Sequence, residues 1–136
     1  MTYIPDRLRD LVYEQARGRC QYCLIHDEDS YKPHEVDHIV AEKHGGQTVA
    51  VNLCLSCFDC NRHKGSDLAS LDPQSGEVVL LFHPQRDRWA EHFALNGGLI
   101  QPISPQGRAT ARLLQFNTSR RIAERSALTE LGRYPR

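Results

Sequence analysis

The chain has 136 residues, a length that fits one compact domain with a single hydrophobic core. Apolar residues make up 40% of it and charged residues 25%, which excludes disordered and membrane-embedded compositions. The net charge is zero, which argues against a protein that coats nucleic acid non-specifically.

The first part of the chain predicts a helix, a strand and a second helix. Apolar residues recur at helical spacing over residues 6–17, and Gly18 ends that helix. Residues 35–40 are rich in β-branched side chains and predict a short strand, followed by a loop at Gly45-Gly46. A helix is then expected from Asn52 to about Lys64, stopped by Gly65.

The second part predicts a mixed extension of strands and helices. A turn at residues 72–76 precedes an apolar strand at 78–82, and a short helix is expected at about 86–93. In that helix Trp89 and Phe93 would pack into the core. Residues 99–103 are expected to be extended, and helices are expected at about 106–116 and 118–131.

We therefore expect a single domain, with an N-terminal helix (1–17), a central core (18–66) and an extension (67–136). Residues 1–61 carry 6 Lys/Arg and 10 Asp/Glu, whereas residues 62–136 carry 11 and 7, so a phosphate-binding surface is expected in the later part. No apolar run approaches the roughly 18 residues of a membrane span, and no leader pattern opens the chain. These features predict a cytoplasmic protein.

Two C-x-x-C pairs predict a structural metal site. Cys20 and Cys23 form one pair and Cys57 and Cys60 the other, with 33 residues between the pairs. Four thiolates can bind Zn²⁺ tetrahedrally in a closed site, and a reducing compartment disfavours disulfides. The alternative is that these are ordinary buried thiols or a redox pair. Cys54 is also three residues from Cys57, but we expect it to be a core residue.

Between and after the cysteine pairs stand Val36-Asp37-His38-Ile39-Val40, Gly45-Gly46, Asn52-Leu53 and Asn61-Arg62-His63-Lys64-Gly65. In this order the motifs resemble the HNH endonuclease family over roughly residues 18–66. The resemblance implies an α+β fold with a zinc-stapled, treble-clef-like ββα-metal core. It also implies metal-dependent hydrolysis of DNA, with duplex DNA as the expected substrate, that leaves a 5′-phosphate and a 3′-hydroxyl.

The resemblance also implies roles for individual residues. His38 would be the general base, Asp37 and Asn61 would hold a catalytic Mg²⁺ or Mn²⁺, and Asn52 would fix the loop. Imidazole titrates near neutrality, and carboxylate and amide oxygens are hard ligands, so these roles make chemical sense. Neighbouring strand residues point to opposite faces, so Asp37 and His38 can meet only at a strand end or on opposite sides of the phosphorus.

Some assignments stay open at this level. His63 would complete the catalytic metal shell or be a solvated helix residue, and Arg62 and Lys64 would bind nucleic-acid phosphates or be plain surface charges. Asn52 also suits a helix N-cap. The alternative functions are a non-catalytic zinc module that binds nucleic acid or protein, and a nuclease for RNA or branched DNA.

Overall fold

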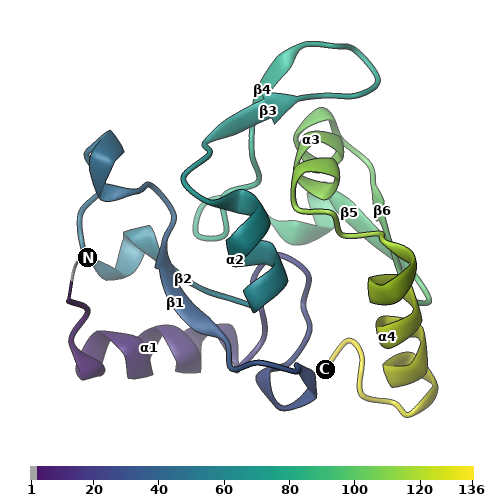
Figure 1. The fold of residues 1–136 in the computed structure, drawn as a ribbon, viewed down its shortest axis with the longest axis horizontal. Coiled ribbons are helices and arrows are strands. Elements are labelled where there is room, and N and C mark those ends of the chain that lie inside the picture. Colours follow the sequence, from purple (N-terminus) through teal and green to yellow (C-terminus); the bar gives the residue numbers. More distant parts are fainter. Residues whose placement is uncertain (1–2) are drawn as a thin grey trace.

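The computed structural model describes residues 3–136. Its elements in chain order are α1 (Asp6–Ala16), β1 (Glu35–His38), β2 (Leu53–Ser56), α2 (Phe58–Lys64), β3 (Ala69–Leu71), β4 (Val78–Leu80), β5 (Phe93–Asn96), β6 (Leu99–Pro102), α3 (Pro105–Leu113) and α4 (Ser119–Glu130). The strands form three antiparallel hairpins, and α2 follows the first hairpin to give a ββα unit (Figure 1). The predicted α+β fold is confirmed.

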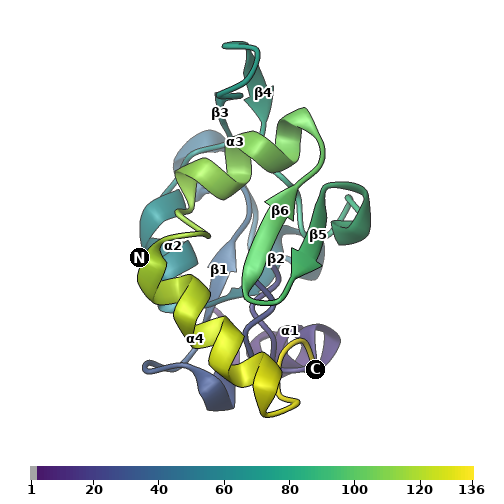
Figure 2. The same cartoon turned by 90° about the vertical axis from the view of Figure 1, so that its right-hand side faces the viewer.

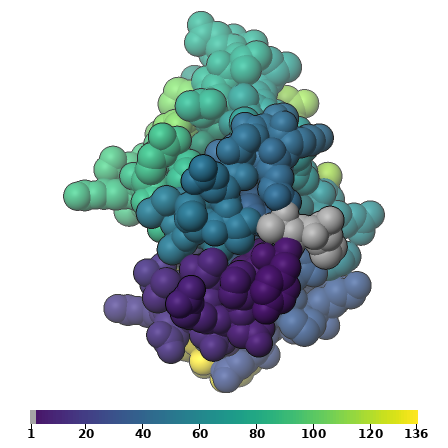
Figure 3. Space-filling view, turned by 90° about the vertical axis from the view of Figure 1, so that its left-hand side faces the viewer, coloured from purple at the N-terminus to yellow at the C-terminus, as the bar shows by residue number. Residues whose placement is uncertain are grey.

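The ββα unit is formed by β1, β2 and α2. In the hairpin Asp37 pairs with Cys54 and His38 pairs with Leu53. Helix α1 packs on this hairpin and contacts the segment just before β2. The helix and this segment lie on the same face of the molecule (Figure 3). Val12 and Ala16 of α1 are buried against Leu53 and Leu55 of β2, which explains the helical spacing of apolar residues in the sequence.

The extension wraps around the other side of the ββα unit. Hairpin β5–β6 and helices α3 and α4 stand together, with α4 running beside β6 (Figure 2). Hairpin β3–β4 projects from the top of the molecule and rests on α3 (Figure 1). The predicted helices at 106–116 and 118–131 and the extended segment at 99–103 are confirmed as α3, α4 and β6.

A single hydrophobic cluster joins the central core to the extension. It contains the cysteines of both pairs and, from the extension, Phe82, Phe93, Ile100, Leu114 and Phe116. The Phe93 ring lies 5.6 Å from Phe82 and from Phe116, in edge or tilted geometry. No helix of residues 3–136 has the length and apolar character required to cross a membrane.

The helix predicted from Asn52 to Lys64 starts later than expected, and the helix predicted at 86–93 is wrong. Residues 53–56 form the buried strand β2, and the helix begins only at Phe58 with Cys57 as its cap. Residues 86–93 contain only a 3-10 turn at Trp89–Glu91, and Phe93 opens β5. Before that turn, the Asp87 carboxylate accepts from the His83 amide and the His83 ring accepts from two amides, so local bonds replace a helix.

Candidate active site and metal centre

The four cysteines of the two C-x-x-C pairs meet in space. Their sulfur atoms all lie within 4.8 Å of one another, and all four residues are buried. The Sγ atoms of Cys23 and Cys57 are 3.7 Å apart. A tetrahedral zinc site with bonds of about 2.3 Å has sulfur–sulfur edges of roughly 3.8 Å, so the cluster fits Zn²⁺.

Hydrogen bonds to the sulfur atoms favour their thiolate forms. The Cys23 amide donates to Cys20 Sγ at 3.5 Å, and the Cys60 amide donates to Cys57 Sγ at 3.4 Å. The Arg121 guanidinium donates to Cys60 Sγ at 3.2 Å. Donors aimed at sulfur stabilise its negative charge, as a metal ligand requires.

Cys54 lies outside this cluster. Its Sγ contacts the Tyr22 hydroxyl at 3.9 Å, and burial raises the pKa of the Cys54 thiol to about 12. Its sulfur is not among the four that come together, so the geometry gives Cys54 no place in the metal site. The structure thus agrees with the expectation that Cys54 is a core residue.

A separate cavity of about 630 Å³ opens beside the ββα unit. Asp37 and His38 reach it from the end of β1, and Asn61 reaches it from α2. Its other lining residues include three charged side chains, which are Arg9, Glu35 and Glu42. Because His38 is the last residue of β1, neighbouring residues on the strand can both face this cavity.

Asp37 is the half-buried acid of the cavity. Burial raises the pKa of its carboxyl group, while the nearby Lys64 ammonium acts in the opposite direction. A divalent cation would favour the charged form still further, because opposite charge lowers a carboxyl pKa. The site therefore offers an anionic oxygen donor in partly desolvated surroundings.

The His38 ring is held by a neighbouring hydroxyl. Its Nε2 lies 2.9 Å from Oγ1 of Thr48. Thr48 belongs to the loop that joins β1 to β2. In the tautomer that donates from Nε2 to this hydroxyl, Nδ1 keeps a free lone pair. The arrangement can orient the imidazole for proton transfer.

The Asn61 side chain is fixed by Glu35. Its Nδ2 donates to Glu35 Oε2 at 2.7 Å. Because the amide nitrogen is engaged there, Oδ1 is the atom that remains for a ligand. An amide oxygen and the Asp37 carboxylate are hard donors that suit Mg²⁺ or Mn²⁺.

Asn52 fixes the loop between the strands. Its Oδ1 accepts from the Val40 amide at 2.9 Å, and its Nδ2 donates to Val40 O at 3.0 Å and to Gln47 O at 2.8 Å. Gly46 lies so close that a Cβ there would stand 1.7 Å from Val40 O. Glycine is therefore required at position 46 by the close approach of the loop to itself, whereas Gly45 is favoured by its positive φ of 89°.

Comparison with known families decides the nature of this unit. Residues 20–67 match the family model described as HNH endonuclease. The chain contains an HNH domain. Comparison with curated proteins finds no match, and comparison with solved structures finds none either. The resemblance seen in the sequence motifs is thereby confirmed over residues 20–67.

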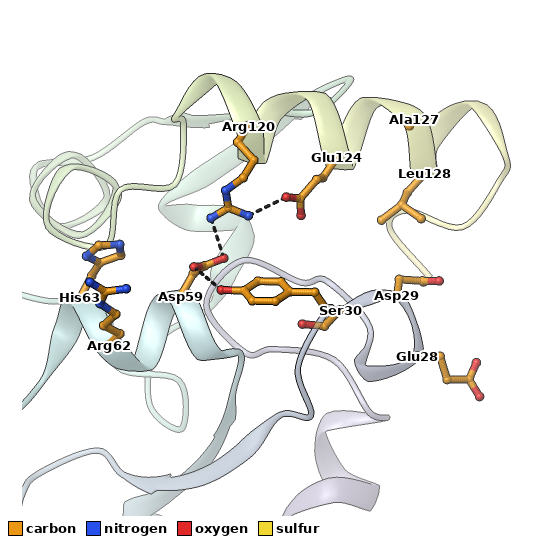
Figure 4. A pocket seen from close by; sticks show the side chains of 11 residues that line it. Glu28, Asp29, Ser30, Asp59, Arg62, His63, Arg120, Glu124, Ala127 and Leu128 are labelled. Atoms are coloured by element: carbon orange, nitrogen blue, oxygen red, sulfur yellow. Dashed lines mark hydrogen bonds and ion pairs between the residues drawn. The ribbon is translucent and has the colours of Figure 1, made fainter.

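His63 lies apart from the cavity of the HNH domain. It lines a different pocket of about 840 Å³ between α2 and α4, together with Arg62 (Figure 4). Residues two apart on a helix lie about 200° apart around its axis, so His63 and Asn61 point away from each other. The expectation that His63 joins the catalytic metal shell does not fit this geometry.

Lys64 also departs from its expected role. Its Nζ donates to Ile39 O at 3.0 Å, and the residue is only 4% exposed. A buried ammonium that is bonded to a carbonyl is not available to a nucleic-acid phosphate, so Lys64 is a structural residue close to Asp37. Arg62 remains exposed, as a phosphate contact requires.

Four residues of the site were not found from the sequence. Glu35 stands two residues before Asp37, and this spacing along a strand could have placed both on one face. Thr48, Glu42 and Arg9 carry no comparable signal. Their roles depend on how the loop and α1 fold against β1, which local patterns do not reveal.

Proposed function

We propose that the protein is a metal-dependent endonuclease that hydrolyses DNA phosphodiester bonds, with duplex DNA as its substrate. The observation that supports this most is that Asp37 and His38 of β1 line the same cavity as Asn61 of α2. Two oxygen donors and one imidazole are the groups that metal-assisted phosphodiester hydrolysis needs.

Asp37 and Asn61 would hold one Mg²⁺ or Mn²⁺ ion through their side-chain oxygens. The bound ion would neutralise negative charge on the scissile phosphate and on the leaving oxygen. Glu35 and Glu42 make the cavity more negative, which favours a cation there. Arg9 adds one permanent positive charge at the cavity wall, where a phosphate can pair with it.

His38 would act as the general base. With Nε2 donating to Thr48, Nδ1 takes the proton of the attacking water. The water oxygen bonds to phosphorus, and the bond from phosphorus to the 3′-oxygen breaks. The leaving 3′-oxygen takes a proton from solvent water, and the products are the 5′-phosphate and 3′-hydroxyl that the family resemblance implies.

Zn²⁺ would have a structural role in this enzyme. The four cysteines hold the residues before β1 to the start of α2, and thus fix the helix that carries Asn61. A closed tetrahedral site has no free position for substrate, so this metal would not take part in hydrolysis.

A cleavage assay on zinc-loaded protein tests the proposal. Supercoiled plasmid should be nicked when Mg²⁺ or Mn²⁺ is added and should stay intact when both are omitted. Parallel assays on single-stranded DNA, branched DNA and RNA of the same length identify the substrate class. DNA binding without cleavage in either ion would contradict the enzyme and favour a zinc-binding interaction module.

A further inference from the structure

Arg121 is a buried cation directed at the cysteine cluster. It lies on α4 and is 4% exposed. Its Nη2 donates to Cys60 Sγ at 3.2 Å and to Cys57 Sγ at 3.8 Å. The Asp59 carboxylate is farther away, at 3.9 Å from Nε. The sulfur atoms are therefore the closest negatively charged partners of Arg121.

Arg125 is a second buried cation one turn later on the same helix, and it is 2% exposed. Its guanidinium donates to the neutral oxygens of Gly98 at 2.7 Å and Phe116 at 2.6 Å. Within residues 3–136, no carboxylate lies within 4.0 Å of it. A buried charge without a counter-charge is costly, and Arg125 lines the same small cavity as Cys23 and Cys57, so negative charge on these sulfur atoms would offset that cost.

The metal centre would supply that negative potential. Four thiolates around one Zn²⁺ carry a net charge of about −2. Two buried guanidinium groups from α4 carry the matching positive charge. Charge balance between α4 and the cysteine cluster would explain why both Arg121 and Arg125 are buried.

The extension also holds the first cysteine pair. The Tyr134 hydroxyl donates to Cys23 O at 2.7 Å, and the Trp89 indole donates to Tyr22 O at 2.8 Å. Tyr134 is buried. Residues after 67 therefore contact both cysteine pairs, one through sulfur and the other through the main chain.

We propose that the extension forms the outer shell of the zinc centre, in which Arg121 bonds to the thiolates and balances their charge together with Arg125. This inference rests on the zinc site proposed above. It makes residues 3–136 one structural unit, since the metal that staples the HNH domain also fixes α4.

Zinc release from Arg121→Met protein tests this proposal. The substitution removes the charge, both sulfur contacts and the hydrogen bonds to Leu114 O and Gln115 O, but it keeps an unbranched side chain. Zinc transfer to a chromogenic chelator should be about 10- to 100-fold faster than from wild type, the usual cost of an outer-shell change. Arg112→Met is the matched control, because Arg112 is exposed on α3, and it should release zinc at the wild-type rate.

A spectroscopic readout separates bonding to sulfur from general packing. In Co²⁺-substituted protein the sulfur-to-cobalt charge-transfer band should move to longer wavelength in Arg121→Met, because the sulfur atoms become more electron-rich. The Arg112→Met band should stay at the wild-type position. A folded Arg121→Met protein with wild-type zinc release and a wild-type band would overturn the proposal.

Wild-type protein provides a test that does not depend on whether variants fold. In ¹¹³Cd-substituted protein, NMR should detect scalar coupling from the metal to an Arg121 guanidinium proton through the sulfur contact. The Cys60 amide, which donates to Cys57 Sγ, is the internal reference. Coupling to the Cys60 amide without coupling to Arg121 would overturn the proposal. Wild-type protein that binds no zinc or cadmium would instead refute the zinc site itself.

Discussion

Asn61 on α2 donates a hydrogen bond to Glu35 at the start of β1, with 2.7 Å between Nδ2 and Oε2. This bond joins the helix to the hairpin directly at the wall of the cavity. It also determines which atom of the Asn61 amide remains available for a metal ion. Glu35 is therefore a positioning residue in the proposed site.

Replacing Glu35 with alanine should lower the rate of DNA cleavage by about 10- to 100-fold, because Asn61 loses the partner that orients its amide. Zinc content should not change. Glu42→Ala is the control, since it removes one negative charge from the same cavity at a different segment. Equal losses of cleavage rate in both variants would show that the negative charge of the cavity matters and that the orientation of the Asn61 amide does not. Single-turnover rates on a labelled duplex provide the measurement.

Asn52→Ala should destabilise the protein by about 1–3 kcal/mol, the cost of leaving part-buried main-chain groups of Val40 without partners. Three hydrogen bonds between Asn52 and the residues Val40 and Gln47 are lost. Asn52→Asp keeps the acceptor for the Val40 amide and should fall between the alanine variant and wild type. Urea unfolding of the zinc-loaded proteins measures the difference. Wild-type stability of Asn52→Ala would refute this role for the side chain.

Cys54→Ala should retain zinc at the wild-type stoichiometry, because Cys54 contacts Tyr22 and lies outside the cluster. Its stability should fall by about 1 kcal/mol from the small cavity that the lost sulfur leaves. Cys57→Ala should lose most of its zinc. Metal analysis after gel filtration distinguishes the two, and loss of zinc from Cys54→Ala would mean that the ligand set is different.

Asp72→Asn should make the stability of the protein less dependent on pH in acid. The Arg108 guanidinium, bonded to Asp72 at 2.8 and 2.9 Å, holds the pKa of that carboxyl well below its usual range. A depressed folded-state pKa stabilises the fold above the unfolded value of about 3.9 and loses this effect as pH falls. The stability gap between wild type and Asp72→Asn should therefore be full at pH 6 and shrink below about pH 4. A gap that stays constant with pH would contradict the ion pair.

The spacing of the metal ligands along the chain could be used for prediction because it is a local feature of the sequence. Two C-x-x-C pairs predicted a four-sulfur cluster, and Cys20, Cys23, Cys57 and Cys60 form one. Asp37, His38 and Asn61 were named from a short ordered pattern, and the structure brings them to one cavity. The catalytic roles themselves remain proposals.

What could not be predicted depends on contacts between distant segments. Lys64 is an ordinary helix lysine in the sequence, and its burial follows from the carbonyl of Ile39 across the hairpin. The helical pattern of apolar residues places Arg121 on the polar face of α4. It is nevertheless buried, because this part of α4 packs on the cysteine cluster. Residues 86–93 failed as a helix because side chains of His83 and Asp87 bond to the main chain.

Comparison of His38→Ala with His63→Ala tests most directly whether the reaction centre lies in the cavity of Asp37 and Asn61. Both substitutions remove an imidazole within the HNH domain, and only His38 lines that cavity. In Mg²⁺ or Mn²⁺, with zinc content matched, His38→Ala should lose plasmid nicking by about 10²- to 10⁴-fold. His63→Ala should stay close to wild type. Full activity of His38→Ala, or loss of activity only in His63→Ala, would contradict the proposed site.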